Sequence, residues 1–375
     1  MTESGSPALA LPAELRPADG RFGCGPSLVR EDQARHVLDS WRDVLGTSHR
    51  QPAVKGLVAR VRSGLAEFLE LPEGYEVILA NGGSTAFWDA AAFGLIERRA
   101  QLATFGEFGG KFAKAAAAPW LEAPLVREAP AGSAIACEPA EGVDVYAYPQ
   151  NETSTGAMLP VRRVADEGAL TVVDATSAAG GTRVDLREAD AYYFAPQKNF
   201  GADGGIWFAA VSPAAIERIE RIAASDRYIP EFLSLAHAVD NSRKEQTLNT
   251  PAISTLLLME RQLQWLNESG GMSFADERTR RSSGAVYAWA EASAYATPFV
   301  AEPSLRSQVV ATIDLDEAVD AKAVATQLRL NGILDTEPYR KLGRNQLRIA
   351  TFVSIEPADV EKLTGAIDWI VERLG

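Results

Sequence analysis

The sequence has little of the residue types that build metal sites, disulfide frameworks and membrane spans. Its 375 residues include two cysteines and three histidines, and these five show no metal-ligand spacing such as HxxxH or CxxC. We therefore expect no metal site and a reducing compartment. No stretch approaches the ~18 apolar residues of a spanning helix, and the N-terminus lacks the basic and apolar segments of a leader. These absences predict a cytoplasmic protein without membrane association.

The chain also lacks an excess of positive charge. Its 37 Lys and Arg face 50 Asp and Glu, which gives a net charge of −13 and a pI near 4.9. Such a charge would repel a nucleic-acid backbone, and no basic run with interleaved aromatics counteracts it, so we expect no nucleic-acid partner. Hydrophobic residues make up 46% and charged residues 23%, which is typical of a globular protein.

Two short apolar runs each lead to an ionisable side chain. The run 170–173 ends at Asp174, and the run 192–195 is followed shortly by Lys198. Ligands of parallel α/β sheets bind at the carboxyl ends of strands, so this acid and this amine are predicted to face one cleft. A buried ammonium is costly without a partner, whereas a covalent imine would remove its charge. The pair suggests pyridoxal phosphate (PLP), with Lys198 as the Schiff-base lysine and Asp174 as the partner of the pyridinium nitrogen. An ordinary solvated lysine is the alternative, although turn-forming residues after both runs favour a site.

The order of expected elements indicates an α/β protein with two domains. Apolar residues spaced three and four apart predict an amphipathic helix over 54–70, and a further helix is expected over 85–99. Strands and helices alternate from residue 75 to 210, which predicts a mostly parallel sheet flanked by helices. A long helix over 251–268 is closed by Ser269-Gly270-Gly271, which is typical of a domain boundary. We predict an N-terminal arm over 1–20, a large domain over 21–271 and a small α+β domain over 272–375.

Small polar residues at other strand ends supply further candidates. The segment 81–85, Asn-Gly-Gly-Ser-Thr, separates a predicted strand from a helix, where free N–H groups and hydroxyls suit a phosphate. Ordinary turn chemistry is its alternative. Phe108 follows another strand and is suited either to stacking on a flat cofactor or to core packing. The segment 151–156 offers hydroxyls at the same edge, or an N-cap for the next element.

Two arginine-containing segments are suited to an acidic substrate. They are 46–50, Gly-Thr-Ser-His-Arg, and 347–349, Leu-Arg-Ile. The planar guanidinium matches carboxylates and phosphates, although each arginine alone could be a surface residue. Thr250 precedes the long helix, where it would serve as an N-cap without any further function.

Taken together, these segments resemble the phosphoserine aminotransferases, in particular the actinobacterial type, nearly from end to end. The motifs that carry the resemblance are those at 22–27, 46–50, 81–83, 151–156, 174–177, 195–200, 249–251 and 343–348. The resemblance implies a PLP-dependent class-V aminotransferase of fold type I. Its aspartate-aminotransferase-like fold would have a large domain with a mostly parallel seven-stranded sheet and a smaller α+β domain. Two such chains would form a homodimer with shared active sites.

The resemblance also assigns roles at the cofactor. It places the covalent link on Lys198, the pyridine nitrogen at Asp174, the ring oxygen near Thr153 and the aromatic stack at Phe108, where more familiar bacterial members have tryptophan. The cofactor phosphate would be held by Ser84, Thr85, Gln197 and, across the dimer, Asn249 and Thr250. An arginine often stands at the place of Thr85.

For the substrate, the resemblance places the anions against His49 of the partner subunit, Arg50 of the partner subunit, and Arg348 of the same subunit. A histidine that many members carry shortly before that arginine is missing here. The candidates to replace it are Arg340, Lys341 and Arg344.

The implied reaction is reversible amino transfer between O-phospho-L-serine and 2-oxoglutarate, giving 3-phosphohydroxypyruvate and L-glutamate in L-serine biosynthesis. The same resemblance implies a second role in pyridoxine biosynthesis, with 4-phosphohydroxythreonine as the substrate. A serine–glyoxylate or alanine–glyoxylate aminotransferase is the alternative. A cysteine desulfurase is disfavoured because both cysteines precede residue 138, and the presence of Lys198 and Asp174 argues against a binding protein without turnover.

Overall fold

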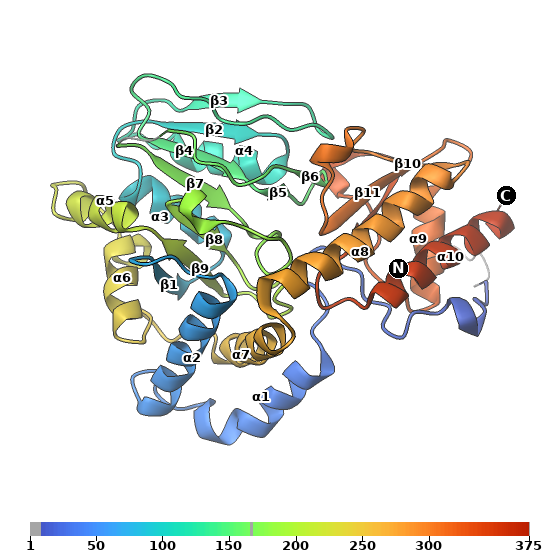
Figure 1. Cartoon of the computed structure of the whole chain (residues 1–375), viewed down its shortest axis with the longest axis horizontal. Coiled ribbons are helices and arrows are strands. Elements are labelled where there is room, and N and C mark those ends of the chain that lie inside the picture. The colour runs from blue at the N-terminus through green and yellow to red at the C-terminus, as the bar shows by residue number, and fades with distance from the viewer. Residues whose placement is uncertain (1–8, 166–167, 375) are drawn as a thin grey trace.

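The structure is a computed structural model that describes residues 9–165 and 168–374. At its centre is a seven-stranded sheet with the order β1-β9-β8-β7-β4-β2-β3 (Figure 1). Strand β9 runs antiparallel to β1 and β8, and the other neighbours are parallel, so the predicted mostly parallel sheet is confirmed. The strands are β1 (Glu76–Asn81), β2 (Ala100–Thr104), β3 (Leu125–Glu128), β4 (Val145–Pro149), β7 (Leu170–Asp174), β8 (Ala191–Phe194) and β9 (Ile206–Val211).

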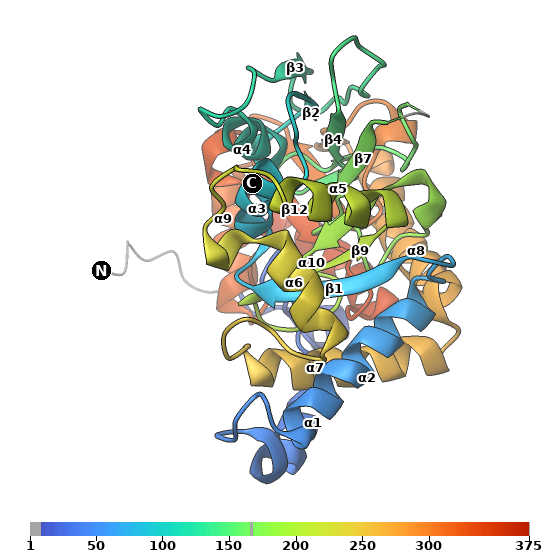
Figure 2. The same ribbon diagram turned by 90° about the vertical axis from the view of Figure 1, so that its left-hand side faces the viewer.

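Helices cover both faces of this sheet because successive strand side chains point to opposite sides. In β8, Tyr192 and Phe194 belong to one apolar core, whereas Ala191 and Tyr193 belong to the other. The first core is covered by α2 (Pro52–Phe68) and α7 (Ile253–Glu268), against which α1 (Glu31–Val44) packs, and Figure 2 shows this group of helices below β1. The second core is covered by α3 (Ser84–Gly94), α4 (Glu107–Ala116), α5 (Pro213–Ala223) and α6 (Leu235–Arg243).

Helix α3 ends at Gly94, before the predicted end at residue 99. The carboxylate of Asp144 accepts the backbone N–H groups of Glu97, Arg98 and Arg99 at 3.0, 2.7 and 2.8 Å. These bonds, made by a residue far along the chain, compete with the helical pattern and direct the chain into β2. The helix periodicity of the sequence could not reveal them.

A third apolar core surrounds the three-stranded antiparallel sheet β10-β11-β12. The long helix α8 (Gly271–Ala292) contributes Met272 and Ala275 to the first core and Val286 and Ala290 to the third. Figure 1 shows α8 crossing from α7 to the three-stranded sheet. The proposed domain boundary between residues 271 and 272 falls at the start of this helix. The elements here are β10 (Ala296–Pro298), β11 (Val310–Leu315), α9 (Ala321–Leu330), β12 (Gln346–Ala350) and α10 (Pro357–Leu374).

Short elements complete the chain between these cores. The two-stranded hairpin β5 (Asn151–Glu152) and β6 (Ala157–Met158) follows β4 at the carboxyl end of the large sheet. The 3-10 turns are Ala13–Leu15, Leu186–Glu188, Glu231–Leu233, Pro303–Leu305 and Arg340–Leu342. Within residues 9–165 and 168–374, no helix has both the length and the apolar character needed to cross a membrane.

Candidate active site

Lys198 lies in the loop after β8 and is 8% exposed. Its Nζ donates a hydrogen bond of 2.9 Å to Oγ1 of Thr153. A Cβ atom at position 25 would lie 2.8 Å from the Lys198 Cε, so glycine at this position allows the backbone to approach the lysine side chain closely. Burial lowers the pKa of Lys198 to about 8, and the positive charge of Arg348 acts in the same direction. The amine is therefore neutral more often than an exposed lysine, and the neutral form is the nucleophile.

Asp174, the last residue of β7, is held in one orientation by three donors. Its Oδ1 accepts the N–H and the hydroxyl of Thr176 at 2.9 and 2.5 Å. Its Oδ2 accepts the indole N–H of Trp88 at 3.2 Å, and that group also donates to the Tyr193 hydroxyl. A carboxylate oxygen can accept two hydrogen bonds, so Oδ2 retains capacity for one more donor.

Sequence reasoning missed Trp88 and Thr176 as supports of this carboxylate. Thr176 stands two residues after Asp174, where a local side-chain turn could have been anticipated. Trp88 stands four residues after Ser84, hence on the same side of α3, and that spacing was the available signal.

The segment 151–156 links Lys198 to the strand ends. The Thr153 hydroxyl accepts from Lys198 and donates to Oγ of Ser177 at 2.9 Å. The Ser177 hydroxyl in turn donates to the carbonyl of Asn151 at 3.2 Å and accepts from the Asn151 amide at 2.8 Å. This chain of donors fixes the direction of the Thr153 hydroxyl, and it brings the predicted ring-oxygen partner beside the predicted cofactor lysine.

Phe108 lies in the first turn of α4, near the same amine. The Nζ of Lys198 is 5.2 Å from the centroid of its ring, and the centroid of the Tyr339 ring is 6.3 Å from it. Tyr339 belongs to the chain before β12, so Phe108 lies between the loop with Lys198 and a residue of the C-terminal part of the chain. This placement suits the predicted stacking role, which stays a prediction.

The predicted phosphate residues lie around the N-terminus of α3. Ser84 is buried and its Oγ lies 2.6 Å from Oγ1 of Thr176, whereas Thr85 is exposed. The N-cap residue, Gly83, makes no side-chain cap, so the first N–H groups of α3 are free for an anion. Gln197 has a buried Oε1 without a hydrogen-bond partner, which indicates unfilled polar capacity beside Lys198.

Arg348, in the middle of β12, reaches the same place. Its guanidinium donates to the carbonyl of Thr153 at 3.3 Å, and its buried Nε has no hydrogen-bond partner among the described residues. Of the three other cations proposed from the sequence, Arg344 pairs with Asp314, and Lys341 pairs with Glu107. Arg340 makes no hydrogen bond or ion pair within the part of the chain that the structure describes.

The remaining predicted residues form a separate group around Asn81. The Nδ1 of His49 lies 3.1 Å from the Thr250 hydroxyl, and the Asn81 amide donates to the Thr250 carbonyl at 2.9 Å. The Asn249 N–H donates weakly to Asn81 at 3.4 Å, and Arg50 bonds to a glutamine side chain nearby. Within residues 9–165 and 168–374, no hydrogen bond joins this group to Lys198.

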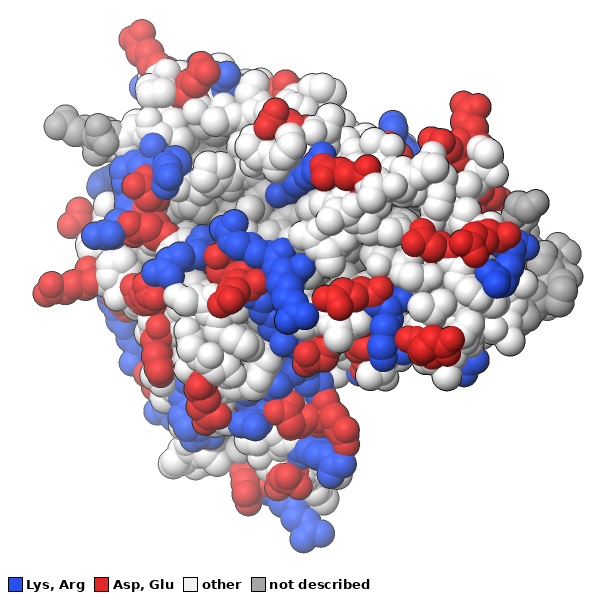
Figure 3. All heavy atoms as spheres, turned by 45° about the vertical axis from the view of Figure 1, so that its right-hand side comes forward, with Lys and Arg blue, Asp and Glu red and all other residues white. Residues whose placement is uncertain are grey.

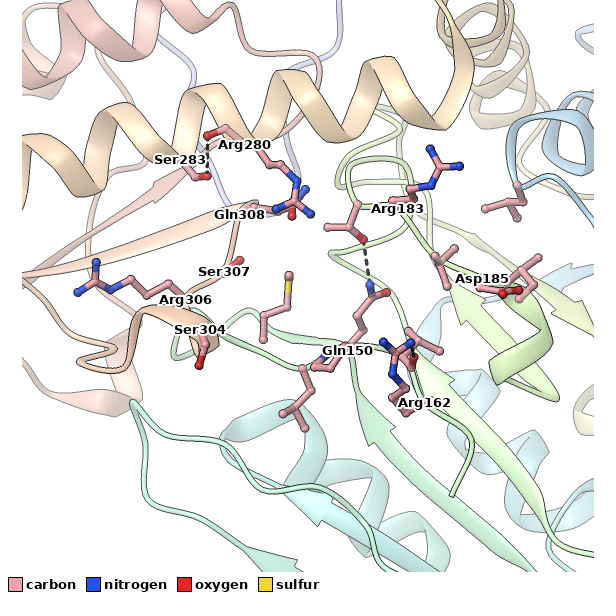
Figure 4. A pocket seen from close by; sticks show the side chains of 18 of the residues that line it. Gln150, Arg162, Arg183, Asp185, Arg280, Ser283, Ser304, Arg306, Ser307 and Gln308 are labelled. Carbon is pink, nitrogen blue, oxygen red and sulfur yellow. Dashed lines mark hydrogen bonds between the residues drawn. The ribbon is translucent and has the colours of Figure 1, made fainter. Parts of the chain in front are cut away.

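A large cavity of about 1220 Å³ lies elsewhere, and none of the predicted site residues lines it. Figure 4 shows it between α8, the chain after β6 and the loop before β11. Its lining has five arginines, but four of them pair with carboxylates. On the face of the molecule that Figure 3 draws, basic and acidic side chains are likewise interspersed. The four pairs are Arg183–Glu70, Arg187–Asp185, Arg280–Asp276 and Arg306–Glu291.

Comparison with known proteins agrees with the geometry around Lys198. Residues 133–335, more than half of the chain, match the family described as Aminotransferase class-V. The phosphoserine aminotransferase of Corynebacterium glutamicum is 58% identical over 364 residues, which cover 96% of this chain and 97% of the relative.

Two solved structures share the fold. A phosphoserine aminotransferase from Cytophaga hutchinsonii matches with a TM-score of 0.87 and 21% identity, covering 95% of this chain and 100% of that one. A PLP-bound phosphoserine aminotransferase from Trichomonas vaginalis matches with a TM-score of 0.80 and 17% identity, covering 93% and 99%. The chain therefore belongs to the class-V aminotransferases, and within them to the phosphoserine aminotransferase family.

Proposed function

We propose that this protein catalyses PLP-dependent, reversible amino transfer between O-phospho-L-serine and 2-oxoglutarate, as part of L-serine biosynthesis. The observation that carries the proposal is the convergence of a buried amine, a carboxylate and a guanidinium at the carboxyl ends of the β7 and β8 strands, which the guanidinium approaches from the three-stranded sheet. Lys198, Asp174 and Arg348 come from three different strands or their following loops, and Thr153 contacts two of them. The identity to the Corynebacterium glutamicum enzyme over nearly the whole chain supports the same reaction.

The residues present fit this cofactor. Asp174 Oδ2 has room for the pyridine N–H, Lys198 Nζ is available for the aldehyde, and Phe108 offers a ring beside it. The free N–H groups at the N-terminus of α3 suit the phosphate, and Gln197 would reach it through its NH2 group, because its unpartnered Oε1 can only accept. When bound, PLP supplies an aldehyde that condenses with amines and a protonated ring that accepts the electron pair released at the substrate Cα.

The protein's own groups then orient the substrate and move one proton. Lys198, freed by the incoming amine, is placed by Thr153 to take the proton from Cα and to return it on the cofactor side. Its lowered pKa, about 8, lies close enough to neutral pH for both directions of transfer. Arg348 is suited to the substrate carboxylate, and burial of its Nε without a partner leaves a hydrogen-bond donor for it.

The pH dependence of cofactor attachment follows from the Lys198 amine. The neutral amine attacks the aldehyde, so the attachment rate rises with pH while Lys198 loses its proton. We expect the rate to level off near pH 8, the pKa set by burial, rather than to rise toward the ordinary lysine value of 10.5. The measurement is the growth of visible absorbance after PLP is added to apo-protein between pH 6 and about 10. The reaction of PLP with a free lysine derivative in the same buffers corrects for titration of PLP itself, and a continued rise above pH 9 would contradict the burial effect.

We propose Arg340 as the substrate-phosphate ligand that replaces the missing histidine, because Lys341 and Arg344 already pair with carboxylates. Wild-type protein should use phosphoserine far better than serine. Arg340→Ala should lower kcat/KM for phosphoserine roughly 10- to 100-fold, the effect of losing a charge-assisted contact, with little change for glutamate. Arg344→Ala is the matched control and should leave both values within about threefold.

Steady-state kinetics with each amino donor separates the alternatives. Equal use of serine and phosphoserine by the wild type would reject the phosphate-directed function and favour a serine–glyoxylate aminotransferase. If the wild type prefers phosphoserine over serine and Arg340→Ala keeps that preference, then Arg340 is not the phosphate ligand. The phosphate-directed function would still stand.

We further propose a homodimer in which a second copy brings the exposed group around Asn81 to the active site. In one chain His49 has a buried Nε2 without a partner, and burial together with the charge of Arg50 lowers the pKa of His49. Thr250 and Asn249 are exposed beside it. These unsatisfied groups support the roles proposed for His49 and Arg50 toward substrate and for Asn249 and Thr250 toward the cofactor phosphate. A single-chain mass by light scattering would contradict this arrangement.

The same anion ligands would accept 4-phosphohydroxythreonine, so we include this compound as a second substrate and pyridoxine biosynthesis as a second pathway. Absence of turnover with it would remove that part of the proposal. The net charge of −13 opposes binding to a nucleic-acid backbone, and we propose a cytoplasmic enzyme without nucleic-acid or membrane partners. Recovery of the enzyme in the membrane fraction of lysed cells would contradict the cytoplasmic location.

A further inference from the structure

Glu152 is a fully buried acid, 0% exposed, and its carboxyl group is the acceptor in each of its four hydrogen bonds. Its Oε2 accepts the backbone N–H groups of Phe108 and Gly109 at 3.0 Å each, and its Oε1 accepts the N–H and the hydroxyl of Ser154 at 3.1 and 2.7 Å. The Ser154 oxygen also accepts the Glu107 N–H at 3.0 Å, so its own hydrogen is directed at Glu152.

In these bonds every partner donates to the carboxyl group and none accepts a proton from it. Backbone N–H groups can only donate, and both oxygens already accept two bonds each. Burial is the largest influence and raises the pKa of Glu152, whereas the bonds from Ser154 and Gly109 act in the opposite direction. Four donors that converge on two oxygens favour the carboxylate over the protonated acid.

The bonds to Glu152 replace a cap that α4 lacks. The N-cap residue of α4 is Gly106, which has no side chain and makes no cap bond. A Cβ atom there would clash with the Glu152 side chain, so a local Ser, Thr or Asp cap cannot be accommodated. Three successive N–H groups, those of residues 107–109, end on Glu152 directly or through Ser154. A negative charge at a helix N-terminus is also favoured by the helix dipole.

The same acid sits next to the partner of the lysine. Thr153, its neighbour in the chain, accepts the hydrogen bond of Lys198 and directs its own hydrogen to Ser177. Phe108, whose N–H ends on Glu152, has its ring 5.2 Å from the Lys198 amine. The side chains of Glu152 and Ser154 therefore tie the α4 end that carries Phe108 to the segment that carries Thr153, and Glu152 is the charged member of this pair.

We propose that Glu152 is a positioning residue: an ionised, buried carboxylate that fixes Phe108 and Thr153 relative to Lys198 and places a negative charge near the lysine nitrogen. It acts through its neighbours and touches neither substrate nor cofactor. The inference rests on the proposed cofactor site, but its capping contacts are present in the protein without cofactor.

The decisive variant is Glu152→Gln. A glutamine amide presents one NH2 group to partners that only donate, so two of the four bonds and the charge are lost. In apo-protein, amide hydrogen exchange at residues 107–109 should rise roughly tenfold, the effect of unmaking such bonds. In the PLP-loaded protein, the midpoint of the pH titration of visible absorbance should fall by about one unit, because a cation at the Lys198 nitrogen loses a nearby negative charge.

Three further variants separate charge, contact and stability. Ser154→Ala removes the hydroxyl relay but keeps the charge, so exchange at residue 107 should rise while the titration midpoint stays. Glu152→Asp keeps the charge on a shorter side chain, so it should restore the midpoint but not the exchange protection. Glu260→Gln is the matched control, because Glu260 is a buried acid on α7 bonded to His36 and Arg60. It should lower the melting temperature and leave both readouts unchanged.

Wild-type values of exchange and midpoint in Glu152→Gln would overturn the inference. So would equal midpoint shifts in Glu152→Gln and Glu260→Gln, because the effect would then be general destabilisation. If Glu152→Gln does not fold, Ser154→Ala and Glu152→Asp carry the test with the outcomes given above. Failure of wild-type protein to bind PLP would instead reject the proposed function, while exchange in apo-protein would still decide whether Glu152 caps α4.

Discussion

Replacing Lys198 with alanine is expected to abolish covalent attachment of PLP and to reduce amino transfer by roughly 10⁴-fold, the upper end of what one positioned proton-transfer group contributes. The reason is that this amine has two tasks: it forms the link to the aldehyde and it moves the Cα proton. Its surroundings serve both, since Thr153 fixes the Nζ position and burial lowers the pKa to about 8. Borohydride reduction followed by mass spectrometry of the intact chain measures the attachment directly.

Lys111 offers a matched control for this variant. Its Nζ is 5.3 Å from the Phe108 ring, nearly the same separation as for Lys198, but its side chain is 43% exposed and pairs with Glu107. Lys111→Ala should therefore keep the adduct and most of the activity. An adduct of undiminished mass and yield in Lys198→Ala, or its loss in Lys111→Ala, would show that another lysine carries the cofactor.

Asp174→Asn should lower the rate of amino transfer by roughly 10²–10³-fold, the range found when one preorganised polar contact to developing charge is removed. The neutral amide no longer balances a proton on the pyridine nitrogen, so the ring accepts electrons less readily. The amide oxygen can still accept both bonds from Thr176, and Lys198 is unchanged, so the covalent link should survive. Single-turnover absorbance with glutamate separates the two effects: attachment retained, conversion slowed.

The matched control is Asp190→Asn. Asp190 is also a buried aspartate, but it precedes β8 at the opposite end from the loop with Lys198 and pairs with Arg163. This variant should lower thermal stability while conversion of bound cofactor keeps its rate. Equal slowing in the two variants, or a rate for Asp174→Asn within a few-fold of wild type, would remove Asp174 from its proposed role.

Local sequence patterns predicted helices and strands well where buried residues recur at a fixed spacing along the chain. The run 170–174 is strand β7 over its full length, and the amphipathic spacing of 54–70 became α2 with its start shifted to Pro52. Such patterns work because alternation or a three-to-four spacing repeats within a few residues. They failed at the end of α3, where the deciding bonds come from Asp144, nearly fifty residues away.

The sequence by itself determined which chemistry is possible here. An amine and an acid that follow apolar strands must share the carboxyl edge of a parallel sheet, because strand direction fixes that geometry, and Lys198 and Asp174 were identified on this basis. Only the tertiary structure decided which groups serve them. It selected Trp88 to orient Asp174, left Arg340 without a partner among the described residues while Arg344 and Lys341 pair with acids, and made Glu152 the cap of α4. These outcomes depend on contacts between segments distant along the chain, and such contacts are set by how the apolar cores pack rather than by any local period.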